Sequence, residues 1–280
     1  MSEIEPTHSA PAAGRQPHSA WIIVPLCAAA LAVLALPFVS HTTAQTPAQG
    51  TATVATTASG TRIKADIRPS DDDLGKFLNN NTGSQVSYTR LSDGFHTGSA
   101  NERFTRPALS LAKLYIADEV FRSGNERQQR LASEMIRTSD DAIAEELYRE
   151  FPDSIDQTAA RYSLYSTRSD GENRWGYSVT SAYDLVSFIS QKIQEDPHDP
   201  LLNAMRSAAP VAADGYAQNY GTATLKGAQG TKWGWSNDHT LNSSVTFGAD
   251  FVAAAAVAGS AEDLTNLVKQ QLTQVNSAAP

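Results

Sequence analysis

Three short motifs hold the residue types that a serine nucleophile needs. They follow one another along the chain as Ser110–Lys113 (SLAK), Ser139–Asp141 (SDD) and Lys232–Gly234 (KWG). A serine becomes reactive when a base takes its proton, and acyl transfer also needs a proton donor for the leaving group. Each motif is weak alone. Their order predicts that they meet in one cleft, as the parts of a serine enzyme that forms an acyl-enzyme.

The first motif lies in residues 109–121, an almost continuous run of apolar and small residues that predicts a buried helix. Ser110 and Lys113 are three positions apart, so a helix places both side chains on one face. Apolar neighbours favour the neutral amine of a buried lysine, and Lys113 could then accept the serine proton. A serine and a lysine at this spacing also occur by chance. The apolar setting is what favours a functional pair.

The second and third motifs each allow two interpretations. Ser139 could relay a proton to the leaving group, or its motif could simply cap a helix, which is the better interpretation of that motif alone. Lys232 could lie on an edge strand and hold a substrate carboxylate, while Gly234 lets the backbone approach the ligand. The alternative for the third motif is an exposed, aromatic-rich turn. Lys226 is a competing lysine, but it lies farther from the two strands predicted after the motif.

Taken in order, the motifs resemble those of the serine β-lactamase and penicillin-binding DD-peptidase superfamily, nearest its class A branch. That superfamily carries Ser-x-x-Lys, then Ser-Asp-Asn, then Lys-Thr/Ser-Gly. Two further stretches, residues 135–142 and 180–185, look like the segments around the second motif and the later threonine-capped helix. The resemblance extends from about Val86 to the C-terminus.

The resemblance implies a role for each motif residue. Ser110 would be the acylated nucleophile, Lys113 its base and Ser139 a proton relay. Backbone N–H groups of Ser110 and Trp235 would form the oxyanion hole. Residues implied to contact the substrate are Asp141, Lys232, Trp233, Gly234 and Trp235. The implied ligand is a peptidoglycan-like peptide or a β-lactam in a bacterial cell envelope, and no metal or cofactor is expected.

Three departures from the family pattern bear on turnover. Asp141 replaces the usual Asn, Trp233 replaces the usual Thr or Ser, and the chain between the first two motifs is short for a class A enzyme. The glutamate that activates the deacylating water in that class has no identified counterpart, and Glu172 is only a guess. Peptidase-like or acyl-binding behaviour is therefore favoured over efficient β-lactamase activity.

A second function belongs to a different class. The chain could be a family member that has lost turnover and serves as a binding or scaffold protein in the envelope. Its ligand would then lie on an aromatic platform. The candidate platform residues are Trp175, Tyr216, Tyr220, Trp233 and Trp235. Retention of Ser110 and Lys113 favours the enzyme, whereas the altered third motif favours the binding protein.

The elements expected around these motifs indicate an α+β fold of the β-lactamase/transpeptidase type. One antiparallel sheet would be built from both chain ends and would carry a helical lobe. The expected strands are 85–91, 242–247 and 251–257, and the expected helices include 131–136 and 141–151. Ser181–Asp184 predicts the start of another helix, and Ser260–Asp263 the start of a final one.

The first 61 residues predict attachment to a membrane. Residues 1–19 are polar and expected to be disordered, and residues 20–39 carry no charge and are long enough for a transmembrane helix or signal anchor. Residues 40–61 read as a flexible linker, followed by a domain over 62–280. The domain would be extracytoplasmic, on a single-pass anchor or secreted after cleavage near Ala44. Cys27 is the only cysteine, so the domain has no disulfide.

Composition limits the other possibilities. Of the 280 residues, 41% are apolar and 19% charged, which suits a folded protein with a substantial core. The net charge of −8 and the lack of a basic stripe argue against nucleic acid as a partner.

Overall fold

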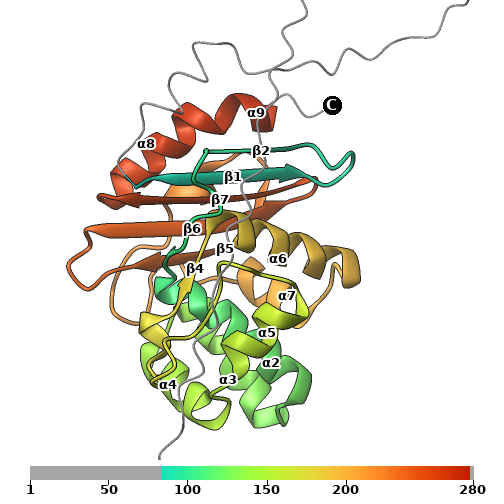
Figure 1. Ribbon diagram of the computed structural model, residues 1–280, viewed down its shortest axis with the longest axis vertical. Helices are drawn as coiled ribbons and strands as arrows, with labels where there is room; N and C mark the ends of the chain where they lie inside the picture. Colours follow the sequence, from blue (N-terminus) through green and yellow to red (C-terminus); the bar gives the residue numbers. More distant parts are fainter. Residues whose placement is uncertain (1–82, 278–280) are drawn as a thin grey trace, which may run out of the picture. The chain divides into compact units, whose positions relative to one another are not determined.

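A computed structural model describes residues 83–277. The predicted disordered segment, membrane segment and linker, residues 1–61, lie outside them. A five-stranded antiparallel sheet crosses the described part (Figure 1). Its strands, in spatial order, are β2 (His96–Gly98), β1 (Gln85–Arg90), β7 (Phe251–Ala258), β6 (Leu241–Gly248) and β5 (Ala228–Trp235). The early strands β1 and β2 pair beside the late strand β7, so the prediction of one sheet from both chain ends is confirmed.

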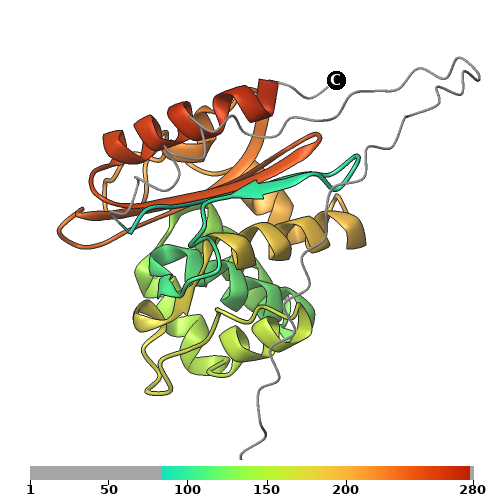
Figure 2. The same ribbon diagram turned by 45° about the horizontal axis from the view of Figure 1, so that its top comes forward.

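Helices cover both faces of this sheet, and most of them form a lobe on one side (Figure 2). The lobe contains α2 (Ala112–Ser123), α3 (Glu126–Thr138), α4 (Asp141–Glu150), α5 (Ser154–Arg161), α6 (Ala182–Glu195) and α7 (Pro200–Arg206). The opposite face carries α8 (Ala261–Gln271) and α9 (Thr273–Ser277). Short elements join these parts: the 3-10 helices η1 (Leu109–Leu111), η2 (Trp175–Tyr177) and η3 (Gly221–Thr224), and the strand pair β3 (Arg106–Pro107) and β4 (Val179–Thr180).

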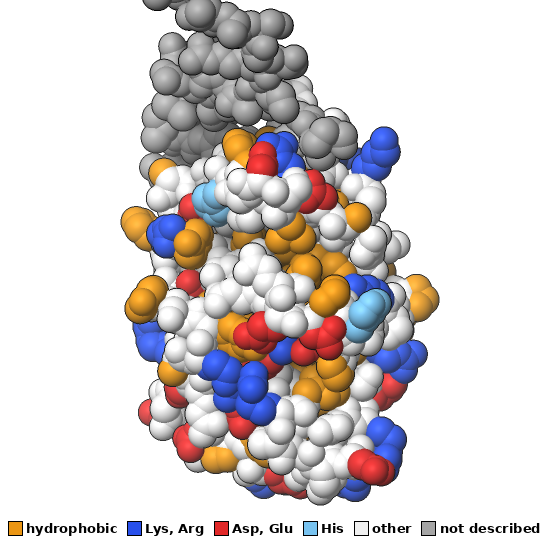
Figure 3. Space-filling model, turned by 90° about the vertical axis from the view of Figure 1, so that its right-hand side faces the viewer, with side chains coloured by type: hydrophobic (Ala, Val, Ile, Leu, Met, Phe, Trp, Pro, Cys, Tyr) orange, Lys and Arg blue, Asp and Glu red, His pale blue; other side chains and the backbone are white. Residues whose placement is uncertain are grey.

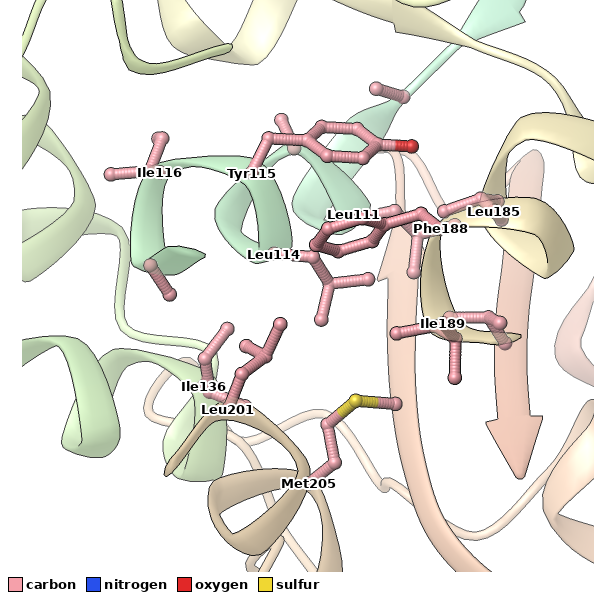
Figure 4. Close-up of a cluster of buried hydrophobic side chains, with 14 of the residues drawn as sticks. Leu111, Leu114, Tyr115, Ile116, Ile136, Leu185, Phe188, Ile189, Leu201 and Met205 are labelled. Atoms are coloured by element: carbon pink, nitrogen blue, oxygen red, sulfur yellow. The ribbon is translucent and has the colours of Figure 1, made fainter. Parts of the chain in front are cut away.

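The core of the lobe is built around α2, whose residues from Ala112 to Val120 are all buried. Leu111, Leu114 and Tyr115 point into a cluster that also receives Phe188 from α6 and Met205 from α7 (Figure 4). Tyr115 and Phe188 pack with ring centroids 5.3 Å apart. From Ala112 to Val120 the helix is covered on all sides, so Lys113 is buried as well, and exposed residues occur only in its last turn.

The sheet separates two hydrophobic cores, one on the lobe side and one under α8. Along β7, Val252 and Ala254 belong to the lobe core, whereas Ala253, Ala255 and Val257 belong to the core under α8. This alternation is the two-residue period of a strand covered on both faces. The same alternation on β5 places the Trp233 side chain on the α8 side, so the residues on either side of it in the sequence face the lobe.

The element boundaries confirm part of the prediction. Strands β6 and β7 agree with the expected ranges to within one residue at each end. Helix α3 is longer than the expected 131–136, because Asn125 and Gln128 form a capping box that starts it at Glu126. Ser260 and Asp263 form the predicted capping box of α8.

Within residues 83–277, no helix is both long enough and apolar enough to cross a bilayer. The predicted membrane segment 20–39 lies outside this range. On the face shown in Figure 3, acidic side chains gather near the centre and basic side chains are scattered around them without forming a stripe.

Candidate active site

Ser110 lies in η1, at the start of the buried helix α2, with 8% of its surface exposed. The residue before it, Leu109, has a φ of 54°, in the left-handed region that a leucine rarely adopts. Such a backbone conformation costs about 1–3 kcal/mol and persists only where the surroundings enforce it. Here the enforcing neighbour is β5, which packs directly on η1.

Lys113 lies one turn further along, and its Nζ contacts four oxygens. Its Nζ is 2.8 Å from Ser110 Oγ and 2.7 Å from the backbone oxygen of Ser139, and it also bonds to Asp141 Oδ1. The side chain is fully buried. Burial lowers the pKa of Lys113 below its ordinary value, and the Asp141 carboxylate partly opposes this shift. A neutral amine has two N–H groups, enough for Ser139 and Asp141, and its lone pair then remains for the Ser110 proton.

Ser139 joins the first motif to the third. Its Oγ is 3.4 Å from Lys113 Nζ and accepts a hydrogen bond of 2.6 Å from Lys232 Nζ. The residue ends α3 with a φ of 57° and is 5% exposed. The capping function belongs to its neighbour, because Asp140 accepts hydrogen bonds from the first amides of α4. The interpretation of the motif as a cap therefore applies to Asp140, and Ser139 is left to face the two lysines.

Lys232 lies on β5, which is the edge strand of the five-stranded sheet, as expected for a lysine facing a site. It is fully buried and donates to Ser139 Oγ and, at 3.1 Å, to the backbone oxygen of Trp233. Burial lowers the pKa of Lys232 well below its ordinary value, and the nearby Lys113 charge lowers it further. Four side chains from three separate segments thus form one continuous chain of contacts, from Ser110 through Lys113 and Ser139 to Lys232.

Gly234 allows β5 to approach η1. A Cβ atom at this position would lie 3.0 Å from Leu109 Cβ and 3.1 Å from the backbone nitrogen of Ser110, closer than ordinary contacts. The sequence predicted that this glycine admits a ligand. The close neighbour in the structure is instead the backbone of the candidate nucleophile.

The strand register orients the amide of Trp235. Ser236 N–H bonds to Leu241 across the β5–β6 pair, and Trp235 is opposite Asn242. Peptide groups alternate along an antiparallel pair, so the N–H of Trp235 points away from β6 and towards the sheet edge. Since η1 packs at this edge, the N–H groups expected to form the oxyanion hole lie on adjoining segments.

The structure corrects the expected role of Trp233. Its indole lies on the α8 side of the sheet, 4% exposed, and its Nε1 donates to the backbone oxygen of Tyr220 at 2.8 Å. The side chain therefore fills the core instead of meeting a substrate, because residues 232 and 233 of a strand point to opposite faces.

The predicted aromatic platform separates into groups. Trp233 and Tyr220 belong to the buried cluster under α8. Trp235 and Tyr216 pack with ring centroids 4.9 Å apart and are partly exposed. Trp175 lies beside the first lysine, with its ring centroid 4.7 Å from Lys113 Nζ, and the Trp235 centroid lies 6.0 Å from Lys232 Nζ. Each lysine of the site thus has an aromatic ring nearby.

Asp214 is a charged neighbour that the motifs did not reveal. Its Oδ2 accepts a hydrogen bond of 2.9 Å from the indole Nε1 of Trp235. The turn that carries it is fixed beside the second motif, since Ala213 N–H donates to the backbone oxygen of Thr138 at 2.8 Å. Its carboxylate raises the pKa of both Lys113 and Lys232, although burial outweighs this effect. The Asp214-Gly215 pair could have predicted a turn, but only the fold brings that turn to the site.

Glu172, the guessed deacylation base, lies in the loop before η2. Its carboxylate pairs with Arg174 at 2.7 Å, and 69% of its side chain is exposed. The contacts that define the site come from other residues. Within residues 83–277, no three His, Cys, Asp or Glu side chains are grouped as ligands of a metal ion.

Comparison with solved structures finds proteins with a similar fold. No family model matches the chain. A class A β-lactamase from Mycobacterium abscessus superposes with a TM-score of 0.58 at 12% identity, over 74% of this chain and 99% of that one. A structure titled "evolved putative penicillin-binding protein homolog" from Mycobacterium tuberculosis gives a TM-score of 0.54 at 15% identity, over 70% and 92% of the two chains.

The sequence relatives are more similar but cover less. A 127-residue segment, 40% of this chain, is 30% identical to "Putative lipoprotein LppW" of Mycobacterium tuberculosis and of Mycobacterium bovis. The match spans 40% of the length of those relatives.

Proposed function

The described residues have the fold of the serine β-lactamase and penicillin-binding protein superfamily, and on that premise we propose that this chain is an envelope serine hydrolase that forms an acyl-enzyme at Ser110. Its substrate would be a cell-wall peptide or a related amide or ester. The contact of 2.8 Å between Ser110 Oγ and Lys113 Nζ carries the proposal, since a proton can pass directly between these atoms.

The proposed reaction uses the chain of contacts in order. Neutral Lys113 takes the Ser110 proton as Oγ attacks the substrate carbonyl carbon. The N–H groups of Ser110 and Trp235 receive the developing oxyanion. Ser139 gives its proton to the leaving group and regains one from the lysines, and Lys232 holds Ser139 in place through a bond of 2.6 Å.

Attachment to the membrane is the second part of the proposal. Residues 20–39 are uncharged and about as long as the hydrocarbon core requires. The curated relatives carry a name that includes "lipoprotein", which is in keeping with an envelope location. The domain would lie outside the cytoplasm, either on this anchor or released from it.

A second candidate is a binding protein without turnover, and one contact favours it. Asp141 replaces a neutral amide and pairs with Lys113, which favours the charged form of the lysine that cannot act as a base. Two further observations point the same way: position 233 carries a buried indole instead of a Thr or Ser hydroxyl, and the exposed Glu172 carboxylate pairs with Arg174. Such a protein would bind its ligand without releasing products.

Covalent labelling separates the two candidates. The purified chain is treated with a fluorescent penicillin and, separately, with a fluorophosphonate, and the labelled peptide is identified by mass spectrometry. The hydrolase predicts an adduct on Ser110 that is absent from Ser110→Ala. The matched control is Ser123→Ala, an exposed serine on the same helix as Lys113, and it should label normally. A folded chain that labels with neither probe would support the binding protein instead.

A further inference from the structure

At the candidate site the lysines lie in the interior, whereas the carboxylates lie nearer the surface. Both lysines are fully buried. Two of the three carboxylates that interact with them are exposed: 72% of the Asp141 side chain is accessible, and Asp214 lies on an exposed turn, whereas Asp140 is half-buried. A ligand that arrives from solvent therefore meets negative charge before it meets either lysine.

The lysines have little capacity left for an anionic ligand. Lys113 Nζ already contacts Ser110 Oγ, the Ser139 backbone oxygen and Asp141. An ammonium group has three N–H groups and a neutral amine has two N–H groups and a lone pair, so these three contacts occupy the nitrogen in either form. Lys232 donates to Ser139 Oγ and to the Trp233 backbone oxygen. The family's third motif would add a hydroxyl for a substrate carboxylate, but the Trp233 side chain points into the core on the other face.

The exposed carboxylate beside Trp235 has the surroundings of a cation site. Trp235 Nε1 donates a hydrogen bond of 2.9 Å to Asp214 Oδ2, so the carboxylate lies next to the indole ring. Tyr216 packs on that indole and donates its backbone N–H to the other oxygen, Asp214 Oδ1, at 2.9 Å. A cation paired with Asp214 would contact aromatic surface at the same time, and both interactions favour an ammonium or guanidinium group.

From this arrangement we infer that the site selects ligands with a cationic group, such as a peptide or acyl chain bearing a free amine, and that Asp214 with Trp235 determines this selectivity. The inference deepens the proposed function and rests on it for the nature of the reaction. It departs from the carboxylate recognition that the third motif implies. Asp141 adds a second exposed carboxylate that acts on the same two lysines.

Binding of matched small amides tests the selectivity without requiring catalysis. The Ser110→Ala chain is titrated with 6-aminohexanamide (cation), hexanamide (neutral) and 5-carboxypentanamide (anion), which differ at the chain end. Binding is followed through the indole N–H resonance of Trp235, assigned with Trp235→Phe. The cation should bind at least about tenfold more tightly than the anion, a difference of about 1.4 kcal/mol. The preference should weaken as salt is added.

A pair of charge-neutralising variants identifies the residue responsible. Asp214→Asn in the Ser110→Ala chain should reduce the cation-to-anion affinity ratio severalfold, towards one. Glu126→Gln changes the net charge equally but lies at the far end of α3, about 20 Å from Ser139 along the helix, and should leave the ratio unchanged.

The inference is overturned if the anion binds as tightly as the cation, or if Glu126→Gln lowers the ratio as much as Asp214→Asn. Failure of the proposed function would be seen separately, as lack of acylation of the wild-type chain by the fluorescent probes. The amide titration does not depend on that result, because Ser110→Ala cannot be acylated at this position.

Discussion

Asp141 and burial act in opposite directions on Lys113. Burial disfavours the ammonium form, and the carboxylate bonded to Nζ favours it. The balance determines how much of the lysine is available as a base at a given pH. The residue type at position 141 is therefore expected to control the reactivity proposed for Ser110.

Replacement of this carboxylate should make the nucleophile more reactive. Asp141→Asn removes the charge that raises the pKa of Lys113, so this pKa falls further below its ordinary value. The neutral fraction of a base rises as pH rises through its pKa, and the rising limb of the acylation rate against pH should therefore move to lower pH. At pH 7 acylation should be faster by about an order of magnitude. The measurement is the rate of fluorescent penicillin labelling between pH 5 and 10.

The matched control for this prediction lies on the same helix. Glu145→Gln removes one negative charge from an exposed position of α4, and its profile should coincide with that of the wild-type chain. A limb that stays in place in Asp141→Asn, or that moves to higher pH, would mean that Asp141 does not hold Lys113 in its charged form.

At the scale of elements, the site depends on how closely β5 meets η1. A Cβ on Gly234 would approach Leu109, Ser243 Oγ and the backbone nitrogen of Ser110 within 3.0–3.1 Å. The same approach places the Trp235 amide near the nucleophile, so the third motif positions the first through backbone packing. The strained φ of Leu109 lies at this contact.

A methyl group at this contact should separate the two elements. Gly234→Ala should lower the acylation rate by about 10- to 100-fold, because displacements of an ångström at a reacting centre have effects of this size. It should also destabilise the fold by about 1–3 kcal/mol. Labelling rates and urea unfolding measure the two effects. Gly176→Ala is the comparison, since a Cβ there has no neighbour within 4 Å; equal rates in the two variants would contradict this account.

Local signals explain which elements could be predicted. The strands β6 and β7 follow from apolar residues on either side of the turn 248–250, and α8 follows from the capping box at Ser260. Helix α3 was underestimated because its first turn, Glu126–Gln129, is polar and its start depends on the Asn125 side chain. Propensity over a few residues did not reveal such a cap.

The site was predictable only where a motif carries it. The contacts of Ser110, Lys113, Ser139 and Lys232 join the residues that the three motifs supplied. Asp214 was missed because its position depends on hydrogen bonds between residues 209–218 and the end of α3, which are far apart in the sequence. Trp233 was misassigned because the motif does not state which face of the strand its middle residue occupies.

At the scale of the whole described part, the lobe that carries two of the motifs is stabilised by a buried network of ion pairs away from the candidate site. Lys192 of α6 pairs with Asp118 of α2 at 2.8 Å and with Asp199, which caps α7, at 2.7 Å. Burial disfavours the charged form of Lys192, but the two carboxylates outweigh it and hold its pKa above its ordinary value. Three helices are thereby joined through one ammonium group.

Removal of this group should destabilise the lobe far more than removal of a surface charge. The Lys192 and Asp118 side chains are 6% and 1% exposed, so Lys192→Met leaves carboxylates in the interior with one fewer partner. Breaking a buried pair in this way costs about 3–5 kcal/mol. In contrast, Arg149 and Glu145 form an exposed pair on α4, and Arg149→Met should change stability by less than about 1 kcal/mol. Urea unfolding of both variants measures the difference, and similar midpoints for the two would mean that Arg161, which also pairs with Asp118, supports the lobe without Lys192.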